Sequence, residues 1–194
     1  MDLNVTSLIS LLSLTLRDPR GAARALMALP LADGARWATV VLMAVLSALA
    51  MQLMTVLAPV VGPDGQRVEP MGPVVWAVMV GLGMVMTAGL VHHVGRWRGG
   101  QGRFGDALIL VAWLQFVQLV LVLLQLVLMF VLPPVVVLVE VLSVGLFLWL
   151  LTHFVAELHG FRSVPLVLAG VLGTFVAVVL VLSLVLLPFF PAGV

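Results

Sequence analysis

The stretch that decides the fold is 106–131, DALILVAWLQFVQLVLVLLQLVLMFV, whose only charged residue is Asp106 at its first position. A helix rises about 1.5 Å per residue, so roughly 20 apolar residues cross a hydrocarbon core about 30 Å thick. Four further stretches of this kind accompany it, at 35–61, 71–94, 135–158 and 164–187. The sequence therefore predicts an all-α, polytopic membrane protein with five transmembrane helices.

Composition supports the same conclusion. The 194 residues are 63% hydrophobic and 9% charged, whereas about a quarter of the residues in soluble domains are charged. This composition excludes an ordinary soluble domain. Because the chain has no Cys, disulfides and thiolate metal sites are also excluded.

The distribution of Arg predicts an orientation. All nine basic residues are Arg, and only Arg67 falls in the connection between the first and second stretches. The other eight precede the first stretch, lie at its start or fall in the connections after the second and fourth: Arg17, Arg20, Arg24, Arg36, Arg96, Arg98, Arg103 and Arg162. Since Arg in short loops resists translocation, we expect a cytoplasmic N-terminus and a C-terminus on the opposite side of the membrane.

Residues 1–34 are expected to form a separate cytoplasmic segment, followed by the five-helix domain at 35–194. Apolar residues in 3–16 recur with a helical period over about 14 residues, too few to span a bilayer. We therefore predict a short amphipathic interfacial helix, with a re-entrant segment as the alternative. Asp18 and Pro19 then predict the N-cap and first residue of a second short helix.

The roles of two arginines near the N-terminus and of the small residues in the predicted spans are left open by the sequence. Arg20 and Arg24, four residues apart, could present charge to anionic headgroups or form a solvated face. Asp33 is predicted to cap the first transmembrane helix.

Small residues at four-residue spacing predict close helix packing, or self-association with membrane-protein partners: Ala44 with Ala48, Ala77 with Gly81, Gly83 with Thr87, and Ala169 with Gly173 and Ala177.

Glu140 is the one carboxylate well inside a predicted span. The Pro133-Pro134 break returns the chain, which places Gln125 at nearly the same depth on the antiparallel neighbour. We expect a Gln125–Glu140 hydrogen bond worth on the order of 1 kcal/mol. Gln118 and Gln115 lie on the same predicted helix as Gln125, and the three amides are expected to form a polar stripe. The structural interpretation is favoured, and the alternative is that Glu140 takes up a proton or binds a substrate.

Polar residues near the cytoplasmic end of the fourth stretch form a second candidate group. His153 and Glu157 are four residues apart, but a convincing metal site needs three or four ligands. Trp113 is predicted at the depth of His153, which could accept a hydrogen bond from the indole N–H. With no catalytic or phosphate-binding motif, we expect no enzyme activity, no metal or other cofactor and no nucleic-acid partner.

The turn Gly99-Gly100-Gln101-Gly102-Arg103-Phe104, followed by Asp106 and the Ala112-Trp113 pair, resembles the bacterial branch of the Yip1 family. Arg17-Asp18-Pro19-Arg20 and His159-Gly160-Phe161 agree with the resemblance. By themselves, Gly99, Gly100 and Gly102 allow positive φ in a tight connection. Phe104 could anchor at the interface, and Asp106 could cap the third helix.

The resemblance implies a cytoplasmic N-terminal region, five membrane helices and no catalytic residues. Eukaryotic relatives are associated with Rab-class GTPases and vesicle traffic. Their acidic, Tyr-containing motif has no counterpart here because the chain has no Tyr, so we do not carry that role across. We expect a non-enzymatic protein of the bacterial inner membrane, with a periplasmic C-terminus, that organises membrane lipids or partner proteins. The alternatives are a small ion- or solute-coupled transporter using Glu140 and the Gln stripe, and an accessory subunit of a larger complex.

Overall fold

The computed structural model describes residues 5–59, 64–66 and 71–187, and within these ranges the regular structure is helical. The helices are α1 (Val5–Arg17), α2 (Pro19–Met27), α3 (Asp33–Leu57), α4 (Pro73–Trp97), α5 (Phe104–Val131), α6 (Pro133–His159) and α7 (Val164–Leu186). The helices α3 to α7 are long and apolar enough to cross a membrane, which confirms the five predicted spans. The connection between the first and second predicted spans, 62–70, lies outside the described residues except for 64–66, and residues 188–194 lie outside them entirely.

Proline and aspartate set several helix boundaries. Pro73 and Pro133 are the first residues of α4 and α6, where a missing N–H leaves no bond unmade. The helix α3 ends at Leu57 rather than at the predicted residue 61, because Pro59 disfavours helical geometry at Ala58. Asp18 caps α2 as predicted, accepting a 2.9 Å hydrogen bond from the Gly21 N–H.

Two other predicted caps are wrong. Asp33 is the first residue of α3, and Ala32 occupies the cap position without a side-chain bond. Asp106 lies in the first turn of α5, whose cap is Arg103, also without a side-chain bond. Both carboxylates are still favourably placed, since a negative charge in the first turn complements the helix dipole.

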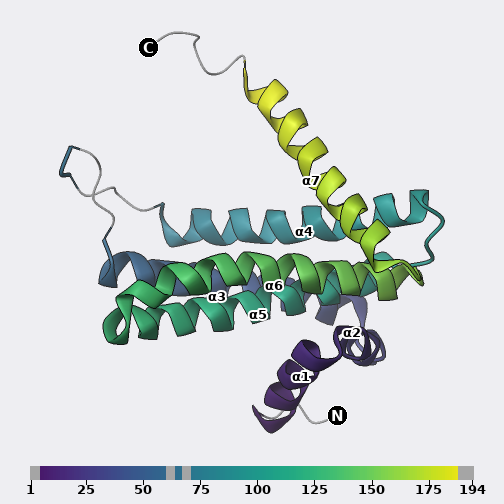
Figure 1. Ribbon diagram of the computed structural model, residues 1–194, viewed down its shortest axis with the longest axis horizontal. Helices are drawn as coiled ribbons and strands as arrows, with labels where there is room; N and C mark the ends of the chain where they lie inside the picture. Colours follow the sequence, from purple (N-terminus) through teal and green to yellow (C-terminus); the bar gives the residue numbers. More distant parts are fainter. Residues whose placement is uncertain (1–4, 60–63, 67–70, 188–194) are drawn as a thin grey trace.

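The helices α3, α4, α5 and α6 run side by side as a long bundle, with α5 in contact with the other three (Figure 1). Ten residues of α5 are buried, including the continuous run Ala107–Leu114. The core of the protein is therefore centred on the half of α5 that follows the glycine turn.

Small residues allow α3 and α4 to approach closely, as their spacing predicted. Ala44 and Ala48 of α3 are 5% and 3% exposed. A Cβ built on Gly81 of α4 would lie 3.5 Å from the Ala44 Cβ, an ordinary contact. The ladder in α7 behaves differently, because Ala169, Gly173 and Ala177 are all exposed. This ladder therefore does not pack against another helix among the described residues.

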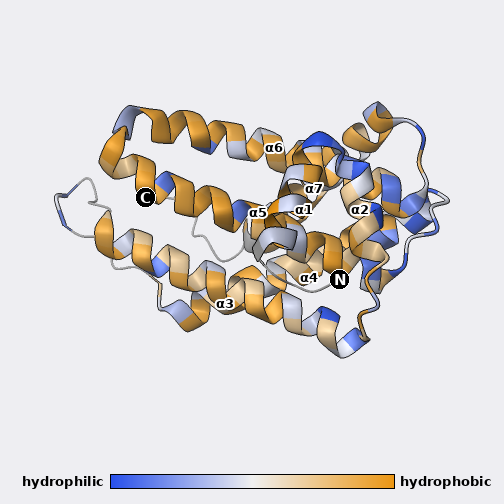
Figure 2. Ribbon diagram, turned by 90° about the horizontal axis from the view of Figure 1, so that it is seen from below, coloured by the Kyte–Doolittle hydropathy of each residue, from blue (hydrophilic) through white to orange (hydrophobic). Residues whose placement is uncertain are grey.

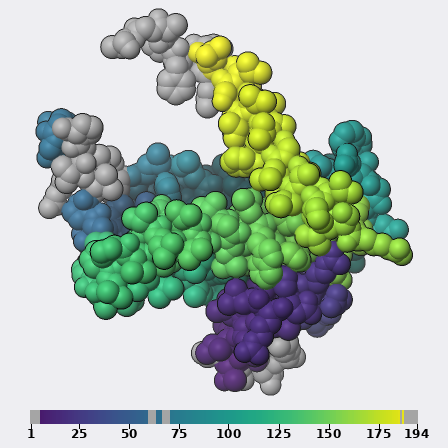
Figure 3. Space-filling view, viewed as in Figure 1, coloured from purple at the N-terminus to yellow at the C-terminus, as the bar shows by residue number. Residues whose placement is uncertain are grey.

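The last helix, α7, leaves the bundle at a steep angle (Figure 3). Gly160 adopts φ 73°, a left-handed conformation that Gly adopts without strain. The Phe161 N–H then closes the end of α6 with a 2.8 Å bond to the Ala156 carbonyl. Val167 is the one residue of α7 that is buried within the described chain. Most of α7 therefore presents its side chains to the surroundings of the protein.

The short helices α1 and α2 lie beneath one end of the bundle (Figure 1). Figure 2 shows apolar colours along α3 to α6 and the densest hydrophilic colour at the end that also carries α2. On α1, Leu8, Leu11 and Leu12 pack against the core cluster, whereas Ile9 and Leu16 are 62% and 50% exposed. The predicted single apolar face is thus divided between protein contact and exposure.

Candidate functional site at the Arg-bearing end

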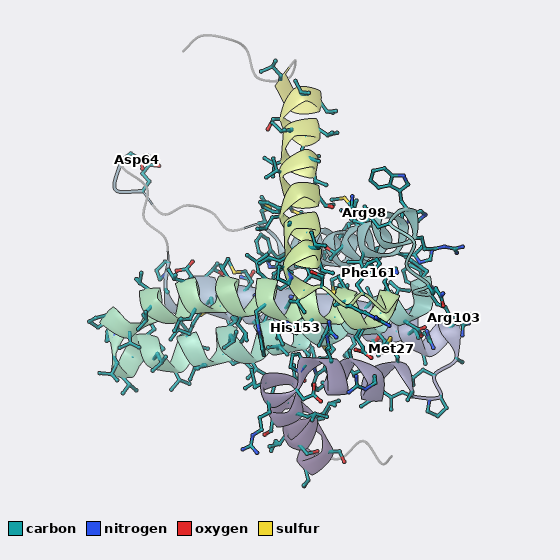
Figure 4. The ribbon with its side chains drawn as sticks, turned by 45° about the vertical axis from the view of Figure 1, so that its right-hand side comes forward. Met27, Asp64, Arg98, Arg103, His153 and Phe161 are labelled. Atoms are coloured by element: carbon teal, nitrogen blue, oxygen red, sulfur yellow. The ribbon has the colours of Figure 1, made fainter. Side chains whose placement is uncertain are left out.

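One end of the bundle collects the polar chemistry of the chain. It comprises α1 and α2, the start of α3, the end of α4, the turn at 98–103, the start of α5, and the α6–α7 connection. We call it the Arg-bearing end, because eight of the nine Arg belong to these segments. Figure 4 shows Arg98 and Arg103 there, with Met27 of α2 beneath them.

A buried histidine, His159, joins three segments at this end. It is 5% exposed, although sequence position placed it just outside the span. The Gly102 N–H donates a 3.1 Å hydrogen bond to Nδ1, and Nε2 lies 3.0 Å from the Val91 carbonyl. Since Nδ1 accepts, Nε2 must carry the hydrogen and donate it, which assigns a neutral ring. His159 thereby links α4, the glycine turn and α6.

The glycine turn is built around this ring. A Cβ on Gly95 or Gly100 would overlap the imidazole, and one on Gly102 would lie 2.6 Å from the Leu158 Cγ and 2.8 Å from the ring Cε1. Only Gly99 in this turn has positive φ, 87°. The expectation that all three turn glycines serve positive φ is therefore correct for one, whereas Gly100 and Gly102 provide space.

Aromatic rings cover the outer side of the turn. His92 Nδ1 lies 3.0 Å from the Gly102 carbonyl. Phe104 begins α5 and packs its ring 5.9 Å from that of His92 and 6.3 Å from that of Trp37. Phe104 is thus part of an aromatic group joining α3, α4 and α5.

Trp113 hydrogen bonds to α1, so the predicted bond to His153 is wrong. Its Nε1–H donates to the Thr15 Oγ1 at 2.9 Å, and Thr15 donates in turn to the Leu11 carbonyl at 2.8 Å. Thr15 is fully buried and Trp113 is 8% exposed. Nothing in the sequence indicates that α1 folds back onto α5. The bond fixes α1 against the bundle.

His153 and Glu157 bond separately. His153 Nδ1 lies 2.8 Å from the Trp149 carbonyl of its own helix. Glu157 accepts a 3.0 Å hydrogen bond from Arg24 of α2. Within the described ranges, no three His, Asp or Glu side chains gather as metal ligands.

Two further arginines hold the short helices and α3 in place. Arg20 donates to the Phe161 carbonyl at 3.1 Å, so both Arg20 and Arg24 are engaged by protein groups rather than free for headgroups. Arg36 of α3 pairs with Asp106 of α5 at 2.7 Å, and the two side chains are 11% and 16% exposed. This pair is shielded from water, so breaking it should be costly.

The predicted Gln stripe does not converge on one site. Gln115 donates to the Ser47 Oγ on α3 at 2.9 Å, while the buried Oε1 of Gln118 has no hydrogen-bond partner among the described residues. Glu140 is exposed, and no hydrogen bond joins it to Gln125 in the part of the chain that the structure describes. The predicted Gln125–Glu140 bond is therefore not formed.

Five exposed arginines remain at the Arg-bearing end. Within the described ranges, the ion pairs of this chain use Arg24 and Arg36, so none includes the five. We call them the arginine surface: Arg17, Arg96, Arg98, Arg103 and Arg162. Ile9, Leu16 and Trp97, which is 81% exposed, add apolar side chains to the same end. These charges are evident from the sequence, whereas the role of His159 is not, because its only signal there is its place in the His159-Gly160-Phe161 motif.

The chain matches the model of a known protein family. The Yip1 domain family matches residues 13–187, a range that runs from α1 to the last residue of the described structure. No curated protein and no solved structure matches the chain.

Proposed function

This chain belongs to the Yip1 domain family, and we propose that it is a non-enzymatic organiser of the bacterial inner membrane, acting on the lipids of the cytoplasmic leaflet. The observation that carries the proposal is the arginine surface. Its five Arg side chains are exposed, and the same end of this multi-pass membrane protein carries the exposed apolar side chains of Ile9, Leu16 and Trp97. Each Arg near an anionic membrane surface contributes about 1 kcal/mol of attraction.

Hydrogen bonds hold the segments of the Arg-bearing end against the bundle, which distinguishes its arginines from those of a flexible charged tail. The helices α1 and α2 are fastened to the bundle by Trp113, Arg20 and Arg24. The connection between α4 and α5 is fastened by His159. The arginine surface can therefore hold several anionic headgroups at fixed spacing.

The lipid shell of the protein tests the proposal. Membranes solubilised with a styrene–maleic acid copolymer yield discs, whose anionic lipid fraction is compared by mass spectrometry with that of the whole membrane. We expect enrichment around the unmodified protein. Joint replacement of Arg17, Arg96 and Arg103 by Gln should return the fraction toward the bulk value. A matched Arg67→Gln variant, altered in the α3–α4 connection, should keep the enrichment. Equal lipid fractions in all three would contradict the proposal.

Orientation is tested separately with reporter fusions. A reporter placed after residue 187 should be active in the periplasm, and one placed before α1 should be active in the cytoplasm. The reverse result would move the arginine surface to the other leaflet.

A further inference from the structure

A groove of about 670 Å³ opens between α4, α6 and α7. It exists because α7 leans away from the bundle (Figure 3). Its walls are almost entirely apolar, with Val91 of α4, Val155 of α6 and Phe175 of α7 among them. Ligand sites in proteins commonly measure about 300–1,000 Å³, so the groove has the volume of a binding site. All three walls are helices long and apolar enough to cross a membrane, so a hydrocarbon chain is the expected occupant of the groove.

The mouth of the groove at the Arg-bearing end is polar and positive. Arg98 from the end of α4, together with Arg162 and Ser163 from the α6–α7 connection, line it. Both Arg side chains are exposed, and neither forms an ion pair within the described ranges. No carboxylate lines the groove. Figure 4 shows Arg98 beside α7 and Phe161 at its base.

We propose that this groove binds one anionic phospholipid, with an acyl chain between α4, α6 and α7 and the phosphate between Arg98 and Arg162. Guanidinium groups bind phosphate oxygens through strong, charge-assisted hydrogen bonds. A zwitterionic lipid would bring an ammonium group to a mouth without a carboxylate, so the site prefers a lipid with net negative charge. The inference rests on the proposed function, because it identifies one lipid that the Arg-bearing end would hold.

Binding is measured by native mass spectrometry of the full-length protein in mild detergent, titrated with phosphatidylglycerol or phosphatidylcholine. We expect one phosphatidylglycerol per chain to be retained at concentrations where phosphatidylcholine is lost. The Arg98→Gln, Arg162→Gln double variant should lower the phosphatidylglycerol affinity by about tenfold or more, because charge-assisted bonds are the stronger class. Inorganic phosphate alone should not displace the lipid, since it leaves the apolar walls uncovered.

Two glycines of α7 form a matched pair for testing the acyl-chain part of the site. Gly170 lines the groove and Gly173 does not. A Cβ at either position would meet no atom within 4 Å, so both Leu variants should fold. Gly170→Leu places a side chain where the acyl chain lies and should abolish retention of the lipid. Gly173→Leu should bind like the unmodified protein.

Equal retention in Gly170→Leu and Gly173→Leu, or no headgroup preference, would overturn the site. So would a dimer that Gly170→Leu dissociates, because a second copy would then be the occupant. These outcomes are separate from failure of the proposed function, which depends on lipid enrichment through Arg17, Arg96 and Arg103. Loss of the single bound lipid in Gly170→Leu with the surrounding enrichment intact would support both.

Discussion

A methyl group added at Gly95 is expected to destabilise the protein strongly. The new Cβ would overlap the imidazole of His159, so the ring must move away from its two partners. Each lost hydrogen bond costs about 1 kcal/mol, and overpacking a filled site costs roughly 1–3 kcal/mol. Replacing Gly by Ala in a helix returns about 1 kcal/mol. We therefore expect Gly95→Ala to lower the free energy of unfolding by roughly 2–4 kcal/mol.

The assay is reversible unfolding in mixed micelles of mild detergent and increasing dodecyl sulfate, followed by the fluorescence of the five Trp residues. Gly89→Ala is the matched control. It lies on the same helix and its Cβ would meet nothing within 4 Å, so it should be neutral or stabilising by about 0.5–1 kcal/mol.

A double-mutant cycle isolates the contact with the ring. Once His159→Ala removes the imidazole, Gly95→Ala should cost almost nothing, because the methyl group then has room. If Gly95→Ala and Gly89→Ala unfold at the same denaturant concentration, or if the cost persists without His159, the reasoning is refuted.

Three other predictions concern polar contacts between helices. Thr15→Val removes the acceptor of the buried Trp113 N–H and should lower stability by about 1–3 kcal/mol in the same assay; Ser13→Ala on the same helix, with no effect, is its control. Arg36→Gln should cost about 3–5 kcal/mol because its carboxylate partner stays shielded, whereas Arg24→Gln, whose side chain is 59% exposed, should cost at most about 1 kcal/mol; similar losses would show that burial does not separate them. Glu140→Gln should leave stability unchanged, since the Glu140 side chain is exposed and forms no hydrogen bond or ion pair within the described ranges; abolished solute uptake in vesicles with normal expression would instead favour the transport alternative.

Hydropathy and local cap and turn chemistry determined the five spans, the Asp18 cap of α2 and the positive φ of Gly99. These features depend on residues close together in the chain. Helix length follows from the run of apolar residues, and a cap needs only a side-chain oxygen within three residues of a free N–H. The observed helix ends differ from the predicted ones by a few residues, because a proline or the glycine turn, rather than the end of the apolar run, ends the helix.

The contacts between helices were decided only by the tertiary structure. Trp113 was predicted to bond to His153 but bonds to Thr15. Two of the three turn glycines predicted to allow positive φ, Gly100 and Gly102, instead make room for His159. Lipid tails are as apolar as a protein core, so hydropathy does not say which face of a membrane helix turns inward. Helix rotation, the fold-back of α1 and the angle of α7 set those pairings, and they also open the groove between α4, α6 and α7.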